Sequence, residues 1–241
     1  RKAGLSPDAV VLVATARALK MHGGVAKDQL TSENVDAIKK GCENLGRHIR
    51  NLKQFGVPVT VAMNRFSADT DDELNAVREF CAEFGVKAFD CNHWGEGSKG
   101  TQEIAQHVAD VADSGQAQFH TLYDDDMGLL DKTKHVARTL YGAEGIVADK
   151  KVRDQFAKFE ADGYGHFPVC MAKTQYSFST DPALMGAPTG HDVPIREIRL
   201  SAGAEFIVVV CGDIMTMPGL PRVPSADNIR LNDAGQVEGL F

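Results

Sequence analysis

Two aromatic side chains occur just beyond two segments that have the composition of buried strands. Phe66 follows the apolar run 57–63, and Trp94, the only tryptophan of the chain, follows the run 86–91. An aromatic ring offers a flat face for stacking, and the amide of Asn64 both donates and accepts hydrogen bonds. These residues predict a site that clamps a flat heterocyclic ring. The alternative is that Asn64 caps a turn and that the two rings pack in the core.

A glycine-rich segment, residues 95–100, comes next and fits the pattern G-x-G-x-x-G. In a dinucleotide-binding fold, a strand with an acidic ligand for the ribose follows this pattern. No such strand is predicted here, which disfavours an NAD-dependent oxidoreductase. The backbone at Gly97 and the charge of Lys99 are suited to bind an anion, although a loop that only turns the chain explains the glycines equally well.

Other residues are candidates to bind a charged ligand or a metal. Lys173 follows a short predicted strand and suits an oxyanion, and Pro218 lies in a stiff apolar loop with two prolines. His22 precedes two glycines after the first predicted strand. The aspartates 124–126 are expected to cap a helix. No metal site is predicted, because the eight histidines and five cysteines lack the spacing of metal ligands.

Alternating strands and helices in the first half must position these residues. Buried strands are predicted at 8–14, 57–63 and 86–91, and helices at 31–55, 71–84 and 101–113. Continuous apolar, β-branched runs are typical of strands covered on both faces, and the intervening helices indicate right-handed crossovers. The order predicts a parallel sheet, and ligands of such sheets bind at the carboxyl ends of the strands.

The pattern changes after about residue 119. Helices are predicted at 127–141 and 150–162, and strands at 168–172, 193–200 and 205–210, with a hairpin of 228–231 and 236–239 around a turn at 232–235. The proline- and glycine-rich stretch 181–194 is a long loop of a kind that often carries function. We therefore predict an α/β domain over 1–118 and a smaller α+β domain over 119–241.

Composition and charge exclude several classes of protein. The chain has 241 residues, of which 43% are hydrophobic and 24% charged, a balance typical of globular proteins. Its formal net charge of −7 argues against nucleic-acid binding through a basic face. No apolar run approaches the roughly 20 residues of a membrane span. Five scattered cysteines indicate reduced thiols in a cytoplasmic protein, and no secretory signal opens the chain.

Four segments of the sequence carry a family likeness. They are VLVATARALKMHGG at 11–24, PVTVAMNRF at 58–66, CMAKTQYSFS at 170–179 and IMTMPGLP at 214–221. Together with the final GLF, they closely resemble formate–tetrahydrofolate ligase, over essentially the whole chain. The resemblance implies an ATP-dependent ligase of one-carbon metabolism, which joins formate to tetrahydrofolate through a formyl phosphate intermediate and gives 10-formyltetrahydrofolate.

Members of this family are longer, so the resemblance implies that the chain is a carboxy-terminal part of such an enzyme. The amino-terminal part would then carry the P-loop and most of the contacts to ATP and Mg²⁺, and the first-half sheet would be of the P-loop-NTPase type. The resemblance further implies activation by a monovalent cation such as K⁺ and assembly as a homotetramer. The alternative is a non-catalytic α/β ligand-binding or regulatory module that lacks its own phosphate loop.

In this family an aromatic pair sandwiches the flat pterin or purine ring, and Phe66 and Trp94 match those positions. Ser67 stands where a proline is expected, and Gly97 is followed by a serine in place of a second glycine. The residues expected to bind substrate are Phe66, Trp94, Asn64, Lys99, Gly97, Lys173 and Pro218. Basic residues are expected to bind a polyglutamate tail, with Arg17, Lys20 and Lys99 as candidates. Catalytic residues are not assigned.

Overall fold

Three strands of the first half form a fully parallel sheet in the computed structural model, which describes residues 1–172, 176–214 and 222–239. The strands are β1 (Val10–Ala14), β2 (Val59–Asn64) and β3 (Ala88–Cys91), in that order across the sheet. Val10 pairs with Val59 at one end, and Asn64 pairs with Cys91 at the other. The predicted parallel sheet is therefore present, and the segments after β2 and β3 leave it at the same edge.

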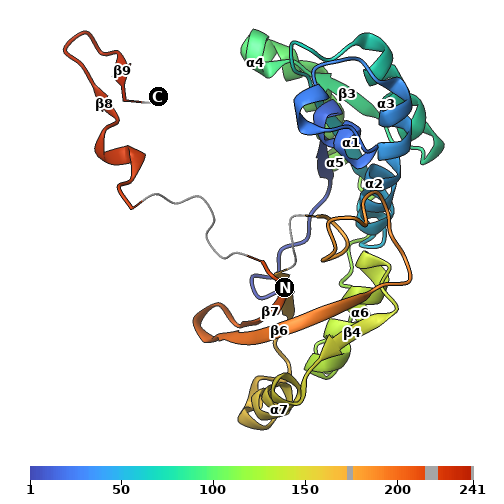
Figure 1. Cartoon of the computed structure of the whole chain (residues 1–241), viewed down its shortest axis with the longest axis vertical. Helices are drawn as coiled ribbons and strands as arrows, with labels where there is room; N and C mark the ends of the chain where they lie inside the picture. The colour runs from blue at the N-terminus through green and yellow to red at the C-terminus, as the bar shows by residue number, and fades with distance from the viewer. Residues whose placement is uncertain (173–175, 215–221, 240–241) are drawn as a thin grey trace.

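Helices cover both faces of this sheet (Figure 1). The helices on one face are α1 (Ala16–His22), α2 (Val35–Lys53) and α3 (Asp71–Glu83). On the other face lies α5 (Gln102–Asp113), which packs through Ile104 against Ala62. Neighbouring residues of β2 point to opposite faces, so Val61 joins the first core and Ala62 the second. None of the helices in the described ranges combines the length and apolar character that crossing a membrane requires.

Two helix starts differ from the prediction because of their caps. Helix α1 was not predicted, and the side chain of Thr15 caps it. Helix α2 begins four residues later than expected. Asn34, and not Thr31 or Ser32, accepts the hydrogen bond from the Ala37 amide, at 2.9 Å. Both helices are short or polar at the start, so local composition does not fix where the first turn forms.

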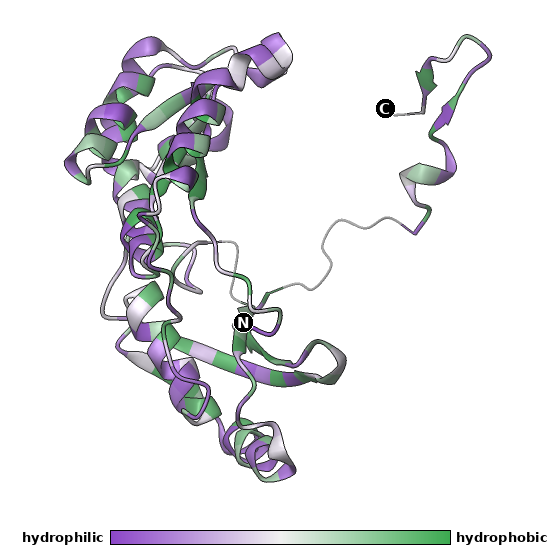
Figure 2. Cartoon of the chain, turned by 180° about the vertical axis from the view of Figure 1, so that it is seen from behind, coloured by the Kyte–Doolittle hydropathy of each residue, from purple (hydrophilic) through white to green (hydrophobic). Residues whose placement is uncertain are grey.

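The second half contains a four-stranded mixed sheet in the order β4-β6-β7-β5. Its strands are β4 (Gly145–Ala148), β5 (Val169–Ala172), β6 (Asp192–Ser201) and β7 (Phe206–Cys211). The central pair is antiparallel, whereas both outer pairs are parallel. Helices α6 (Leu129–Tyr141) and α7 (Lys150–Phe159) pack on one face around Phe156. Figure 2 shows hydrophobic and hydrophilic residues alternating along β6, as expected of a strand with one buried face.

The chain is thus a mixed α/β protein with one parallel and one mixed sheet. Strand β4 was not predicted, and its four residues are too few to show a period. The predicted hairpin is present as β8 (Arg230–Leu231) and β9 (Val237–Glu238), which lie apart from both sheets (Figure 1). The division at residue 118 stays a prediction.

The aspartates 124–126 do not cap α6, contrary to the prediction. The cap position of that helix is Gly128, and the amide of Leu129 donates to Glu160 Oε1 at 2.6 Å. A carboxylate from the far end of α7 therefore satisfies the first turn, which the local sequence could not reveal. Within the described ranges, no three His, Cys, Asp or Glu side chains are grouped so that they could hold a metal ion.

Candidate functional site

The two predicted ring-binding residues lie just beyond the carboxyl ends of β2 and β3. The amide of Arg65 donates to Cys91 O at 3.1 Å, so the two chains stay side by side for one residue beyond the last pair. Phe66 follows at once and is 44% exposed, and Trp94, in the short helix α4 (His93–Glu96), is 91% exposed. Neither ring packs in the core. Both are open to solvent at the edge where parallel sheets bind ligands.

Asn64 lines an apolar cavity of about 370 Å³ next to this edge. Its walls come from β1, β2 and α5, and they include Val11, Ala62 and Ile104. His93, the residue before Trp94, also lines the cavity. An open apolar hollow with one amide and one imidazole in its wall can seat one face of a flat ring and orient it by hydrogen bonds.

Gly97 and Lys99 lie in a 3₁₀ turn (Gly97–Thr101) between α4 and α5. Gly97 has φ +59° and nothing near the position of a side chain, so its backbone conformation accounts for the glycine. Lys99 lines a polar cavity of about 400 Å³ together with Arg65, but Asp90, Glu96 and Glu103 line it as well. The cavity holds both signs of charge and is not a simple anion pocket.

Three basic residues were predicted as candidates to bind a polyglutamate tail, and for Lys20 this prediction is wrong. Its side chain is fully buried, and its Nζ lies 2.8 Å from Glu73 Oε1 and 3.1 Å from Ser32 O. A buried, paired ammonium group cannot reach a solvated ligand. Arg17 is exposed, and its guanidinium carbon lies 6.0 Å from the centroid of the Phe66 ring, within the range of a cation–π contact.

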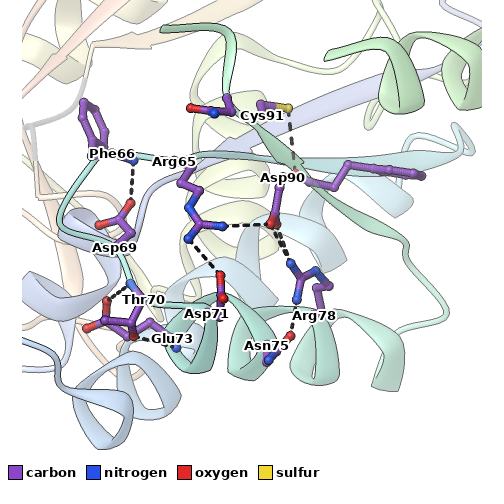
Figure 3. Close-up of polar contacts among 12 residues, drawn as sticks. Arg65, Phe66, Asp69, Thr70, Asp71, Glu73, Asn75, Arg78, Asp90 and Cys91 are labelled. Atoms are coloured by element: carbon purple, nitrogen blue, oxygen red, sulfur yellow. Dashed lines mark hydrogen bonds and ion pairs between the residues drawn. The ribbon is translucent and has the colours of Figure 1, made fainter. Parts of the chain in front are cut away.

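Charged residues missed in the sequence surround the loop between β2 and α3 (Figure 3). Arg65 lies 2.8 Å from Asp71 and 3.7 Å from Asp90. Asp90 also accepts two hydrogen bonds from Arg78, both at 2.7 Å. The partners come from separate elements, so the sequence carries no local signal of this network, and the capping-box spacing of Thr70 to Glu73 marks only the start of α3.

Cys91, between the two aromatic segments, is no nucleophile. Burial and the negative charge of Asp90 raise the pKa of its thiol. A thiol with a raised pKa stays neutral and unreactive near neutral pH. Cys91 therefore serves the core beneath the site, where it packs with Ala62 and Ile104.

His22 lies at the contact between the two halves of the chain. Its Nδ1 accepts a hydrogen bond from the Gly186 amide at 3.2 Å, and its Nε2 lies 3.4 Å from Ser177 Oγ. Burial lowers the pKa of His22, which favours the neutral ring that this acceptor role requires. Asn44 of α2 donates to Gly186 O at 2.9 Å, so the long loop is held against α1 and α2. Lys173 and Pro218 lie outside the described residues.

Comparison with known proteins matches the family model "Formate--tetrahydrofolate ligase" to residues 1–241. Formate–tetrahydrofolate ligases of Roseobacter denitrificans and Sinorhizobium medicae are 61% and 60% identical over the whole chain. The relative from Pelagibacter ubique is 58% identical over the same 241 residues. The chain spans 43%, 42% and 43% of the length of these three curated relatives. With a family model matched over every residue and relatives near 60% identity, the chain belongs to the formate–tetrahydrofolate ligase family.

Proposed function

We propose that this protein joins formate to tetrahydrofolate with consumption of ATP and that the residues described here bind the folate ring. The observation that carries the proposal is the match to the ligase family over all 241 residues. The structure adds two solvent-exposed rings, Phe66 and Trp94, at the ligand-binding edge of a parallel sheet. The pterin ring of the folate would stack against both aromatic side chains, and Asn64 would contribute hydrogen bonds from the neighbouring cavity.

The chemistry requires an activated formyl group, because formate itself is a poor electrophile. In the proposed reaction the γ-phosphoryl group of ATP is transferred to a formate oxygen, which gives formyl phosphate. The folate amine then attacks the carbonyl carbon, and phosphate leaves as the carbon–nitrogen bond forms. Phe66 and Trp94 would hold the ring so that its amine lies at attack distance, and a closed site would keep water from the intermediate.

Part of this machinery is proposed to come from residues that the longer relatives have and these 241 residues do not span. We assign the P-loop and most contacts to ATP and Mg²⁺ to that amino-terminal portion, which would extend a P-loop-NTPase-type sheet. Val11 and Val13 support this assignment. They are 43% and 56% exposed on β1, one of the two edge strands of the described sheet, and exposed apolar edge strands favour further pairing or packing.

The proposal has four further parts: a monovalent cation, an assembly state, additional substrate contacts and a location in the cell. Activation by a monovalent cation such as K⁺ and assembly as a homotetramer follow the family resemblance. Lys99 and Gly97 would contact the substrate from the 3₁₀ turn beside Trp94, and Lys173 and Pro218 are retained as proposed contacts. A cytoplasmic location is supported by the five free cysteines, four of which are buried.

Steady-state kinetics of the complete reading frame test the proposal. Wild type is expected to form 10-formyltetrahydrofolate only when formate, ATP and tetrahydrofolate are all present. Loss of one stacking ring in Phe66→Ala or Trp94→Ala is expected to raise the KM for tetrahydrofolate about tenfold to a hundredfold. Phe66→Tyr keeps the ring face and should stay near wild type. Val147→Ala removes a side chain of similar exposure from the other sheet and serves as the control.

Two results would contradict the proposal. Folate binding without any formate- and ATP-dependent turnover would favour the non-catalytic binding module. Turnover with an unchanged KM in both alanine variants would retain the ligase but remove Phe66 and Trp94 from the ring site.

A further inference from the structure

A buried carboxylate closes the turn that carries Phe66. Asp69 Oδ2 accepts a hydrogen bond from the Phe66 amide at 2.8 Å, and the Asp69 amide donates to Phe66 O at 3.0 Å. Asp69 is only 5% exposed, whereas Phe66 is 44% exposed. Figure 3 shows the ring of Phe66 pointing away from this carboxylate. One residue thus fixes both backbone polar groups of Phe66 from below and leaves the ring face free.

The residue before Phe66 ties the turn to β3, the strand that leads to Trp94. Besides the backbone hydrogen bond of Arg65 to Cys91 described above, the guanidinium group lies 3.7 Å from Asp90, which is a residue of β3. Arg65 is 32% exposed at its side chain, so these contacts are partly shielded from solvent. The turn therefore has a fixed position relative to the strand end that carries the second ring.

The residue after Asp69 anchors the other end of the turn. Thr70 and Glu73 form a reciprocal capping box at the start of α3, with both hydrogen bonds at 3.3 Å. Glu73 is itself fully buried and paired with Lys20. Both ends of the turn are thus attached to the core, and Asp69 is the group that closes the turn between them.

We propose that Asp69 is a positioning residue that holds the Phe66 ring ready to stack on the folate, an inference that rests on the proposed function. A ring that is ordered before the ligand arrives spends no binding free energy on ordering the turn. Without the carboxylate, the Phe66 amide loses its acceptor, and only the backbone hydrogen bond from the Asp69 amide to Phe66 O still closes the four-residue turn. The turn then samples other conformations, and only a fraction of them present the ring.

The test compares Asp69→Ala with Asp69→Asn in the complete reading frame. Loss of a hydrogen bond to a charged acceptor is expected to raise the KM for tetrahydrofolate about tenfold in Asp69→Ala, equivalent to about 1.4 kcal/mol. The KM values for ATP and formate should stay within about twofold of wild type, since neither ligand uses the Phe66 face. Asp69→Asn keeps a neutral acceptor oxygen and should give an intermediate rise of about threefold.

A matched control separates positioning from general stability. Asp149 Oδ1 accepts a hydrogen bond from the Val152 amide, also at 2.8 Å, as the cap of α7 in the second half. Asp149→Ala removes a hydrogen bond of the same type and length from an exposed aspartate, far from Phe66 in the sequence and next to the other sheet. It should lower the thermal stability without changing the KM for tetrahydrofolate.

A double variant decides whether Asp69 acts through Phe66. In a Phe66→Ala background the ring is gone, so Asp69→Asn and Asp69→Ala should cause no further rise in KM. The same rise in both backgrounds would overturn the inference, as would an equal rise in all three KM values. The inference would also be overturned if folded Asp69→Asn had an unchanged KM for tetrahydrofolate and Asp69→Ala either had an unchanged KM as well or did not fold. Failure of the proposed function looks different, because Phe66→Ala alone would then leave the KM unchanged or wild type would not turn over.

Discussion

The buried ion pair between Lys20 and Glu73 allows a sharp test of how the first half is held together. Lys20 of α1 and Glu73 of α3 are both fully buried, with Nζ and Oε1 2.8 Å apart. The substitution Lys20→Met keeps most of the side-chain volume and removes the charge. It leaves the Glu73 carboxylate buried with only backbone donors, chiefly the Asn34 amide at 2.8 Å.

The expected loss of stability follows from this geometry. Removal of one partner of a buried ion pair costs about 3–5 kcal/mol. Because backbone amides still donate to the Glu73 carboxylate in Lys20→Met, we expect a loss at the lower end of this range, about 3 kcal/mol. With a denaturant slope of about 1–3 kcal/mol per molar urea, the midpoint of unfolding should fall by about 1–3 M. The double variant Lys20→Met/Glu73→Gln removes the stranded charge and should recover to within about 1 kcal/mol of wild type.

The pH dependence of the same variants adds a second, independent readout. Burial alone would raise the pKa of Glu73, but hydrogen bonds from Lys20, Asn34 and Thr70 lower it below 4.5. In wild type this contribution to stability is present above pH 4.5 and is lost as the pH falls toward the lowered pKa. In Lys20→Met, burial is less opposed, so the pKa of Glu73 rises. Protonation of Glu73 then removes the unpaired buried charge in the variant. The difference in the free energy of unfolding between wild type and Lys20→Met should therefore shrink as the pH falls from 7 to 4.

Urea unfolding followed by far-ultraviolet circular dichroism at both pH values measures these differences. A loss below about 1 kcal/mol in Lys20→Met would refute the reasoning, because it would mean that the carboxylate is solvated or neutral. A double variant as unstable as the single one, or a deficit that does not change with pH, would refute it as well.

Other predictions concern close packing, a second buried lysine and the contact between the halves. A Cβ at Gly41 would lie 1.9 Å from Leu19 O, so Gly41→Ala must push α1 and α2 apart and should cost about 2 kcal/mol or more in urea unfolding, whereas an unchanged midpoint would contradict the packing. Lys132 is fully buried and donates to three backbone carbonyl oxygens at 2.8, 2.8 and 3.0 Å. Lys132→Met strands these acceptors and should lower stability by about 3 kcal/mol, with thermal unfolding as the assay and a melting temperature equal to that of wild type as the contrary result. Burial lowers the pKa of His22 below 6.5, so the unfolded chain takes up a proton first and stability should fall as the pH drops below 6.5. His22→Asn offers Gly186 an acceptor that does not titrate and should flatten this part of the stability profile; an equally steep profile would show that His22 is not its source.

Apolar runs determined the strands of the first half. The runs 57–63 and 86–91 became β2 and β3, and the parallel pairing followed from the helices between them. This succeeded because continuous apolar composition and turn glycines are local signals. Two short elements, β4 and α1, were missed, because four and seven residues without a continuous apolar run do not establish a period.

The position of the two candidate ring-binding residues was also predictable in part. The rule that ligands bind at the carboxyl ends of parallel strands selected Phe66 and Trp94, and both are exposed there. What the sequence could not supply was the support beneath them. Asp69 looks like an ordinary turn residue, and only the fold shows that its carboxylate is buried under the Phe66 amide.

The sequence by itself determined the family, the parallel direction of the first three strands and the edge at which the two rings lie, since motifs and hydrophobic runs are properties of neighbouring residues. Tertiary structure alone decided which charges are buried and paired. Lys20 reads as a solvated lysine that could hold a polyglutamate tail, yet α1, α2 and α3 enclose it against Glu73. The reason is physical: a pair between distant residues depends on how helices pack, and burial changes a flexible surface cation into a fixed part of the core.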